Sequence, residues 1–196
     1  MVAIATAQMT AEEFYIWAEL PENAGARYEL ENGVPVEMPN PTNLHAVICW
    51  LVSQIISPYF LARGGFVATN DGGLLIRRRP DTVRGPDVAA FPTRPAFKDL
   101  PRGPATEVPS LVVEVLSPSD RPHRTTRRVK DYLRRGIPVV WTLEPDDCTV
   151  EIHTRTGAVL LEATDELVGD PELPGFRCPV AAFFSWPDAP PTPAAP

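Results

Sequence analysis

The chain has 196 residues, of which 44% are hydrophobic and 22% are charged. These values predict one globular domain with a substantial core and exclude a largely disordered chain. The formal net charge of −7 argues against strong nonspecific binding of nucleic acid by the surface as a whole.

The sequence predicts neither a targeting segment nor a membrane span. Residues 1–8 carry no basic residue before their apolar stretch, unlike a secretory signal, and no apolar run approaches bilayer-spanning length. Three scattered cysteines, Cys49, Cys148 and Cys178, are typical of reduced thiols. Because we find no C-x-x-C motif and no paired His/Cys spacing, we expect no structural zinc site. The expected protein is cytoplasmic and has no membrane partner.

The N-terminal part of the chain predicts a helix, a hairpin and a second helix. Residues 10–13 (TAEE) form a capping box, which marks a helix start. Asn32-Gly33 lies between the short strand patterns of residues 27–30 and 34–38, and this dipeptide is a strong hairpin signal. Apolar residues then recur at helical spacing from about residue 42 to residue 61.

Strand patterns dominate the chain from residue 66 onward. They lie at residues 66–69, 74–77, 88–91, 111–116, 137–143 and 148–155. The run at 111–116 is continuously apolar except for Glu114, which is typical of a central strand covered on both faces. A helix expected from Ser117 to about residue 135 connects it to the next strand, so these two strands should be parallel.

We therefore predict an α/β (α+β) fold with a mixed central sheet flanked by helices, an N-terminal helix-hairpin extension and extra C-terminal strands. Residues 1–186 should form a single domain. The last residues, 187–196, are mostly Pro and Ala and are predicted to be a disordered tail.

Basic residues gather in one stretch despite the acidic balance of the chain. Residues 121–135 hold seven cations against a single acid, Asp131. This run is either a basic face for phosphate contacts or an ordinary solvated helix surface, and the pattern leaves both interpretations open.

Two acids lie where neighbouring strands would bring them to one sheet edge. Asp87 follows Pro86 at the start of one strand, and Glu114 lies 27 residues later in the apolar strand. Two carboxylates, a backbone carbonyl and waters suit Mg²⁺ or Mn²⁺, which could activate water for phosphodiester chemistry. The alternatives are a turn-closing role for Asp87 and a buried salt bridge from Glu114 to an arginine.

These stretches resemble a known family. Residues 84–88 (RGPDV) and 111–119 (LVVEVLSPS) are similar to the PD-(D/E)XK nuclease superfamily, and most similar to the bacterial Uma-type family of restriction-endonuclease-like proteins. Residues 27–33 (RYELENG), His45, residues 130–132 (KDY) and Gly136 agree with the same pattern. The resemblance covers about residues 10–186.

The resemblance implies a restriction-endonuclease-like core and a divalent-metal-dependent nuclease. By position, Asp87, Glu114 and the main-chain carbonyl of Val115 would be metal ligands, and Glu29 would approach the site. Leu116 stands where the superfamily often has lysine, so the resemblance assigns that role to Lys130 on the following helix.

Three functions remain open at this point. The first is an endonuclease that hydrolyses DNA with Mg²⁺ or Mn²⁺, using Asp87, Glu114, Lys130 and Glu29. The second is a nuclease-fold binding or regulatory module without turnover, which the acidic balance and Leu116 favour. The third is a hydrolase of a small phosphorylated substrate. A homodimer is expected only by analogy with nucleases that reach both strands of a duplex.

Overall fold

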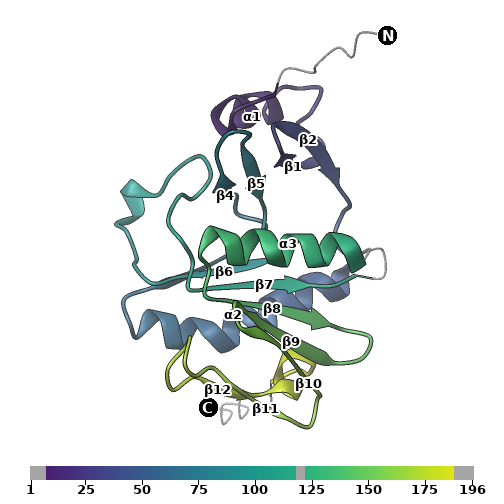
Figure 1. Cartoon of the computed structure of the whole chain (residues 1–196), viewed down its shortest axis with the longest axis vertical. Coiled ribbons are helices and arrows are strands. Elements are labelled where there is room, and N and C mark those ends of the chain that lie inside the picture. The colour runs from purple at the N-terminus through teal and green to yellow at the C-terminus, as the bar shows by residue number, and fades with distance from the viewer. Residues whose placement is uncertain (1–7, 118–121, 188–196) are drawn as a thin grey trace, which may run out of the picture.

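The computed structural model describes residues 8–117 and 122–187 (Figure 1). The helices are α1 (Ala11–Ala18), α2 (Asn43–Leu61) and α3 (Pro122–Arg135). The strands are β1 (Arg27–Glu31), β2 (Val34–Met38), β3 (Phe66–Thr69), β4 (Leu74–Arg77), β5 (Thr82–Arg84), β6 (Val88–Phe91), β7 (Leu111–Val115), β8 (Val139–Glu144), β9 (Thr149–Thr154), β10 (Gly157–Leu161), β11 (Glu166–Val168) and β12 (Arg177–Pro179). Two 3₁₀ turns, η1 (Phe97–Asp99) and η2 (Val180–Phe184), complete the set. The predicted tail lies outside the described residues, except for residue 187.

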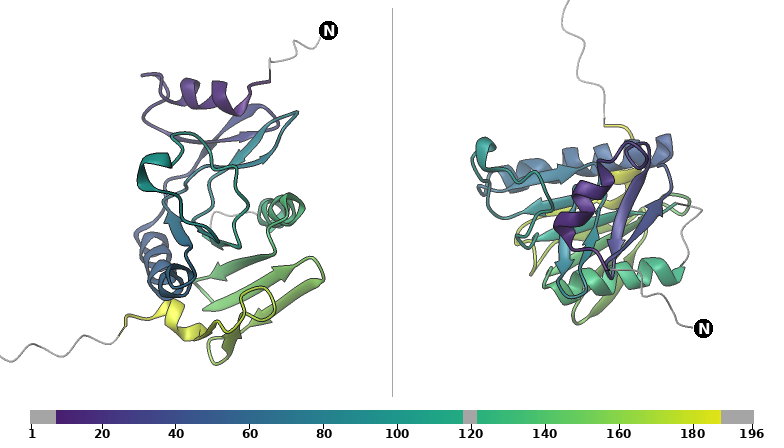
Figure 2. Two further views of the ribbon diagram at one scale, coloured as in Figure 1. Left: turned by 90° about the vertical axis from the view of Figure 1, so that its left-hand side faces the viewer. Right: turned by 90° about the horizontal axis from the view of Figure 1, so that it is seen from above.

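A six-stranded mixed sheet forms the centre of the molecule, with strand order β10-β9-β8-β7-β6-β3. Strands β7 and β8 are parallel, as the strand-helix-strand pattern predicts, and the other neighbours are antiparallel. Helices α2 and α3 cover opposite faces of this sheet (Figure 2). The predicted class, a mixed sheet flanked by helices, is confirmed.

The alternation of side chains along β7 decides where Glu114 points. Val113 and Val115 pack in the core cluster on the α2 face, whereas Val112 packs with Tyr132 of α3 on the other face. Since successive side chains of a strand point to opposite faces, Glu114 shares the α3 face with Val112. The buried acid therefore lies beneath the helix that carries the basic stretch.

The N-terminal hairpin belongs to a second sheet of four strands, with order β2-β1-β5-β4. Asn32 and Gly33 both have positive φ, 54° and 78°, as the turn predicted for Asn-Gly requires. Helix α1, which starts at the predicted capping box, packs Phe14 against this sheet. Neither β5 nor this division into two sheets was predicted from the sequence. The division places the hairpin over one end of the central sheet and above α3 (Figure 1).

Helix α2 corrects one expectation from the sequence. It has 19 residues, and its most apolar window has a mean hydropathy of 1.6, so by length and composition it is long enough to cross a bilayer. The statement that no apolar run approaches that length is therefore wrong. One face of α2 packs Ile48, Val52, Ile56 and Phe60 into the core against the sheet, as the core helix of a folded domain does.

Candidate active site

A cavity of about 300 Å³ opens where the ends of β6 and β7 meet the hairpin and the first turns of α2 and α3. Asp87 and Glu114 both line it, and so does Val115. The two acids that are 27 residues apart in sequence thus face one space, as their positions on neighbouring strands predict. Cationic side chains share the lining, namely Arg27, His45, Arg124 and Arg128.

Asp87 is held from two sides through one oxygen. Its Oδ2 accepts a hydrogen bond of 2.7 Å from the backbone N–H of Val115 and lies 3.2 Å from Nε2 of His45. Thr42 caps α2 by accepting from the backbone N–H of His45, which fixes the histidine at the helix start. The hydrogen bond to Asp87, together with the contact to Cys49, raises the pKa of His45 to about 10, so the imidazole is cationic at neutral pH.

Glu114 is bound by two groups of α3, also through one oxygen. Its Oε1 accepts from Nη2 of Arg128 at 2.9 Å and from the hydroxyl of Tyr132. Burial, together with the charge of Asp87, raises the pKa of Glu114 to about 7 against the opposing charge of Arg128. Glu114 therefore forms the buried salt bridge to an arginine that was expected as the alternative, and it also lines the cavity.

Glu29 is buried and lies next to this pair. Its Oε1 accepts from Nη1 of Arg128 at 2.7 Å and from the backbone N–H of Gly85 at 2.9 Å, and its Oε2 accepts from Nη1 of Arg84 at 3.0 Å. Burial alone would raise the pKa of Glu29, but Arg128 and Arg84 outweigh it and lower that pKa. Glu29 is therefore a buried acid, and Arg128 joins it to Glu114.

Lys130 lies elsewhere. It is exposed on α3 and is not among the residues that line the cavity. Two residues along a helix correspond to a rotation of about 200°, so when Arg128 points inward, Lys130 points outward. The α3 cation that contacts the predicted acids is Arg128, and the structure does not bring Lys130 beside them; a catalytic role for Lys130 stays a prediction.

Three residues that take part in the site were not predicted from the sequence. Arg128 was one cation among seven, and its signal was its position four residues before Tyr132, which places both on one helix face. Arg84, fully buried, binds both Glu29 and Asp131 and so ties β1 to α3. Asp71 lines the cavity and pairs with Arg27.

The oxygen atoms in the cavity suit a small, hard cation. Within the described part of the chain, the hydrogen bonds to Asp87 use its Oδ2 and those to Glu114 use its Oε1. The other two oxygens, Oδ1 of Asp87 and Oε2 of Glu114, have no protein partner there. Burial and repulsion from Asp87 disfavour the charged form of Glu114 and so raise its pKa. A bound divalent ion would favour the charged form. These two carboxylates fit Mg²⁺ or Mn²⁺, and Val115, which also lines the cavity, could add its main-chain carbonyl.

The fold recurs in a solved structure. The chain is similar to a crystal structure, at 1.96 Å resolution, of a protein from Anabaena variabilis ATCC 29413 described as "a putative nuclease belonging to DUF820". The TM-score is 0.70 at 20% identity, over 91% of this chain and 98% of the other. At this identity the likeness shows a shared fold. No curated protein matches the chain.

The fold and the site together define a nuclease-like α+β protein. The model of the Uma2 family, described as "Putative restriction endonuclease", matches residues 11–181. The chain belongs to this family, which confirms the resemblance seen in the sequence.

Proposed function

We propose that this protein is a divalent-metal-dependent endonuclease that hydrolyses phosphodiester bonds in DNA. The observation that carries the proposal is the convergence of Asp87 and Glu114 on one cavity in a chain of the Uma2 family. Their carboxylates, with the carbonyl of Val115, would hold the ion. When bound, the cation would polarise a phosphoryl oxygen and lower the pKa of a coordinated water.

The protein's own groups would then orient the ligands and bind the substrate. The N–H of Val115 and the imidazole of His45 fix the Asp87 carboxylate, and Arg128 and Tyr132 fix that of Glu114. Arg124 lines the cavity near the start of α3, where its guanidinium can contact a phosphate oxygen. Glu29 acts through Arg128, whose position it holds.

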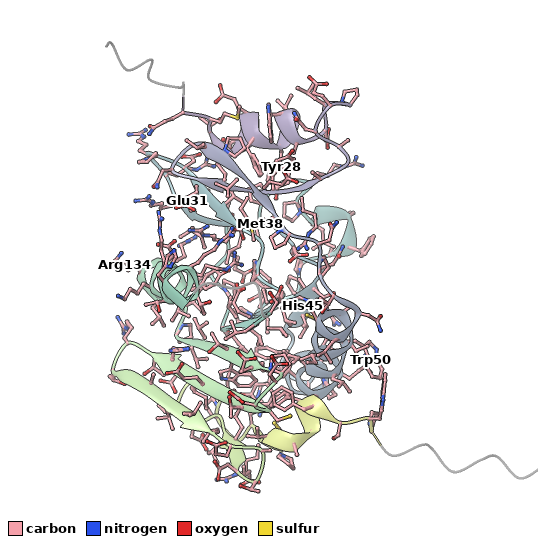
Figure 3. The ribbon with its side chains drawn as sticks, turned by 90° about the vertical axis from the view of Figure 1, so that its right-hand side faces the viewer. Tyr28, Glu31, Met38, His45, Trp50 and Arg134 are labelled. Carbon is pink, nitrogen blue, oxygen red and sulfur yellow. The ribbon has the colours of Figure 1, made fainter. Side chains whose placement is uncertain are left out.

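The exposed side of α3 would contact the DNA backbone. Lys130 and Arg134 are exposed there, and in Figure 3 Arg134 projects from the outer side of the helix. Such contacts give sequence-independent, salt-dependent affinity and position a duplex without reading its bases. A basic helix face next to the cavity also explains how an acidic protein can bind DNA.

The test is cleavage of supercoiled plasmid with Mg²⁺ or Mn²⁺. We expect wild-type protein to nick or linearise the plasmid, and Asp87→Asn to reduce the rate at least about a hundredfold, because one ligand to the ion is lost. The matched control is Asp147→Asn, which neutralises an exposed acid in the turn between β8 and β9. Equal rates for wild type and Asp87→Asn, or no cutting by wild type, would contradict the proposal.

One observation favours a second candidate, a nuclease-fold module that binds DNA without turnover. Arg128 already supplies positive charge to both Glu29 and Glu114, so these acids are partly neutralised without a metal. A module of this kind would bind DNA equally well with a chelator or with Mn²⁺ and would leave it uncut. A gel-shift series under both conditions separates the two functions.

A further inference from the structure

A histidine, a cysteine and an aspartate meet at the edge of the cavity. His45 and Cys49 are one helical turn apart on α2, so they share a face of the helix. Cys49 Sγ lies 3.5 Å from His45 Nδ1, and His45 Nε2 lies 3.2 Å from Asp87 Oδ2. The expectation that the sequence holds no paired His/Cys spacing is therefore wrong, because His45-x₃-Cys49 is such a pair.

The three side chains are close enough to share one ion. Each offers a ligand atom, and these atoms all lie within 4.8 Å of one another. Around a tetrahedral zinc ion, bond lengths of about 2.0 Å to nitrogen or oxygen and 2.3 Å to sulfur place ligand atoms roughly 3–4 Å apart. Because one ion binds only one of the two imidazole nitrogens, the ring of His45 would rotate as the three ligand atoms close around the ion.

We propose that His45, Cys49 and Asp87 form a binding site for one transition-metal ion of the zinc class. A sulfur, a nitrogen and an oxygen ligand favour Zn²⁺ or Co²⁺ over Mg²⁺, which prefers oxygen alone. The thiol and imidazole protons that now lie among the three groups would pass to solvent as the ion binds. The fourth coordination position would face the cavity, since His45 and Asp87 line it.

This site differs from the oxygen site between Asp87 and Glu114. It draws two of its three ligands from α2, and the two sites share only Asp87. Figure 3 places His45 where α2 approaches the hairpin that carries Met38. Whether the site binds metal is independent of whether the protein cuts DNA, so the failure of one proposal leaves the other standing.

The rival account is that the three groups form a hydrogen-bonded trio whose only role is to orient Asp87. A cobalt titration separates the two accounts, because a Co²⁺–thiolate bond gives a charge-transfer absorption band and a hydrogen-bonded thiol gives none. Full-length protein, reduced and freed of metal with a chelator, would be titrated with Co²⁺. We expect the band to saturate at about one equivalent and to disappear when Zn²⁺ is added.

Variants assign the ligands. Cys49→Ser should abolish the band, and His45→Gln should weaken Co²⁺ affinity at least about tenfold, because each removes one ligand. The matched control is Cys148→Ser, which changes another half-buried cysteine and should leave the titration unchanged. Absence of the band from wild type, or its persistence in Cys49→Ser, would overturn the proposal.

A second measurement uses the unaltered chain, in case a variant does not fold. Zn²⁺ should slow alkylation of Cys49 at least about tenfold and leave the alkylation rate of Cys148 unchanged, as read by peptide mass mapping. Equal effects of Zn²⁺ on the two thiols would count against the site.

Discussion

At the scale of single residues, the cavity consists of acids that would repel one another without their partners. Burial and the charge of Asp87 raise the pKa of both Glu114 and Asp71. Arg27 pairs with Asp71, and Arg128 pairs with both Glu114 and Glu29. Removing one cation from such a buried set leaves a charge without a partner, which costs far more than a surface pair contributes.

Tyr132→Phe tests the hydrogen bond to Glu114. The hydroxyl is buried and donates to a carboxylate, so its loss should lower the free energy of unfolding by about 1–3 kcal/mol. Urea denaturation measures the change. The control is Tyr28→Phe, because the Tyr28 hydroxyl makes no hydrogen bond among the described residues. Equal losses of unfolding free energy in the two variants would show that the hydrogen bond to Glu114 does not stabilise the fold.

His45 makes the stability of the fold depend on pH. Its pKa is raised from 6.5 to about 10 in the folded state, chiefly by the hydrogen bond to Asp87, so the folded protein holds a proton that the unfolded chain releases between these values. The stabilisation is complete below pH 6.5 and is lost as the pH rises towards 10. We therefore expect the stability difference between wild type and His45→Gln to be largest near pH 6 and to shrink by pH 10 in urea titrations. A difference that grows with pH would have the wrong sign.

At the scale of elements, α3 has an inner and an outer face with different roles. Its inner face carries Arg128 and Tyr132 to the acids of β1 and β7, and its outer face carries Lys130 and Arg134. If the protein binds DNA as proposed, the position of a cation on this helix decides whether it would act on the site or contact the DNA backbone.

Lys130→Ala distinguishes these roles. Loss of an exposed phosphate contact should reduce DNA affinity a few-fold. It should also reduce the magnitude of the slope of log K against log salt by about one, without changing the cleavage rate at saturating DNA. Fluorescence anisotropy across a salt series and single-turnover cleavage measure the two quantities. A hundredfold loss of the saturated rate would instead restore Lys130 to the catalytic role that the family resemblance assigned to it.

Much of the fold could be predicted from the sequence because its signals are local. The capping box at Thr10, the Asn32-Gly33 turn and the apolar run of β7 each fix an element within a few residues. Strand β5 escaped prediction because it has three residues and pairs with β1 through a single register position, Leu30 with Val83. No local sequence pattern predicts such a pairing.

Part of the site could also be predicted from local signals in the sequence. A carboxylate in a run of buried valines needs a partner, which made Glu114 conspicuous. Which of seven cations supplies that partner depends on the rotation of α3 about its axis, and the sequence does not fix that rotation to within one residue. The contact of His45 with Asp87 was likewise hidden, since it joins α2 to the loop before β6, 42 residues later.

At the scale of the whole molecule, two metal sites would share one aspartate. If the nuclease proposal holds, Zn²⁺ bound at His45, Cys49 and Asp87 would remove Asp87 from the oxygen site. Micromolar Zn²⁺ should then slow Mg²⁺-dependent plasmid cleavage at least about tenfold in wild type and much less in Cys49→Ser. Equal inhibition of both proteins would show that the thiol takes no part. The cytoplasmic location and the homodimer stay predictions.

Asp87 and Glu114 are proposed to hold a divalent ion together, and calorimetric titration with Mn²⁺ measures that binding. We expect heat of binding from wild-type protein and from Asp147→Asn, and loss of that heat in both Asp87→Asn and Glu114→Gln. Because Glu114 has no part in the zinc-class site, its variant reports on the oxygen site alone. Unchanged Mn²⁺ binding by Glu114→Gln, or no binding by wild type, would show that the two acids do not share an ion.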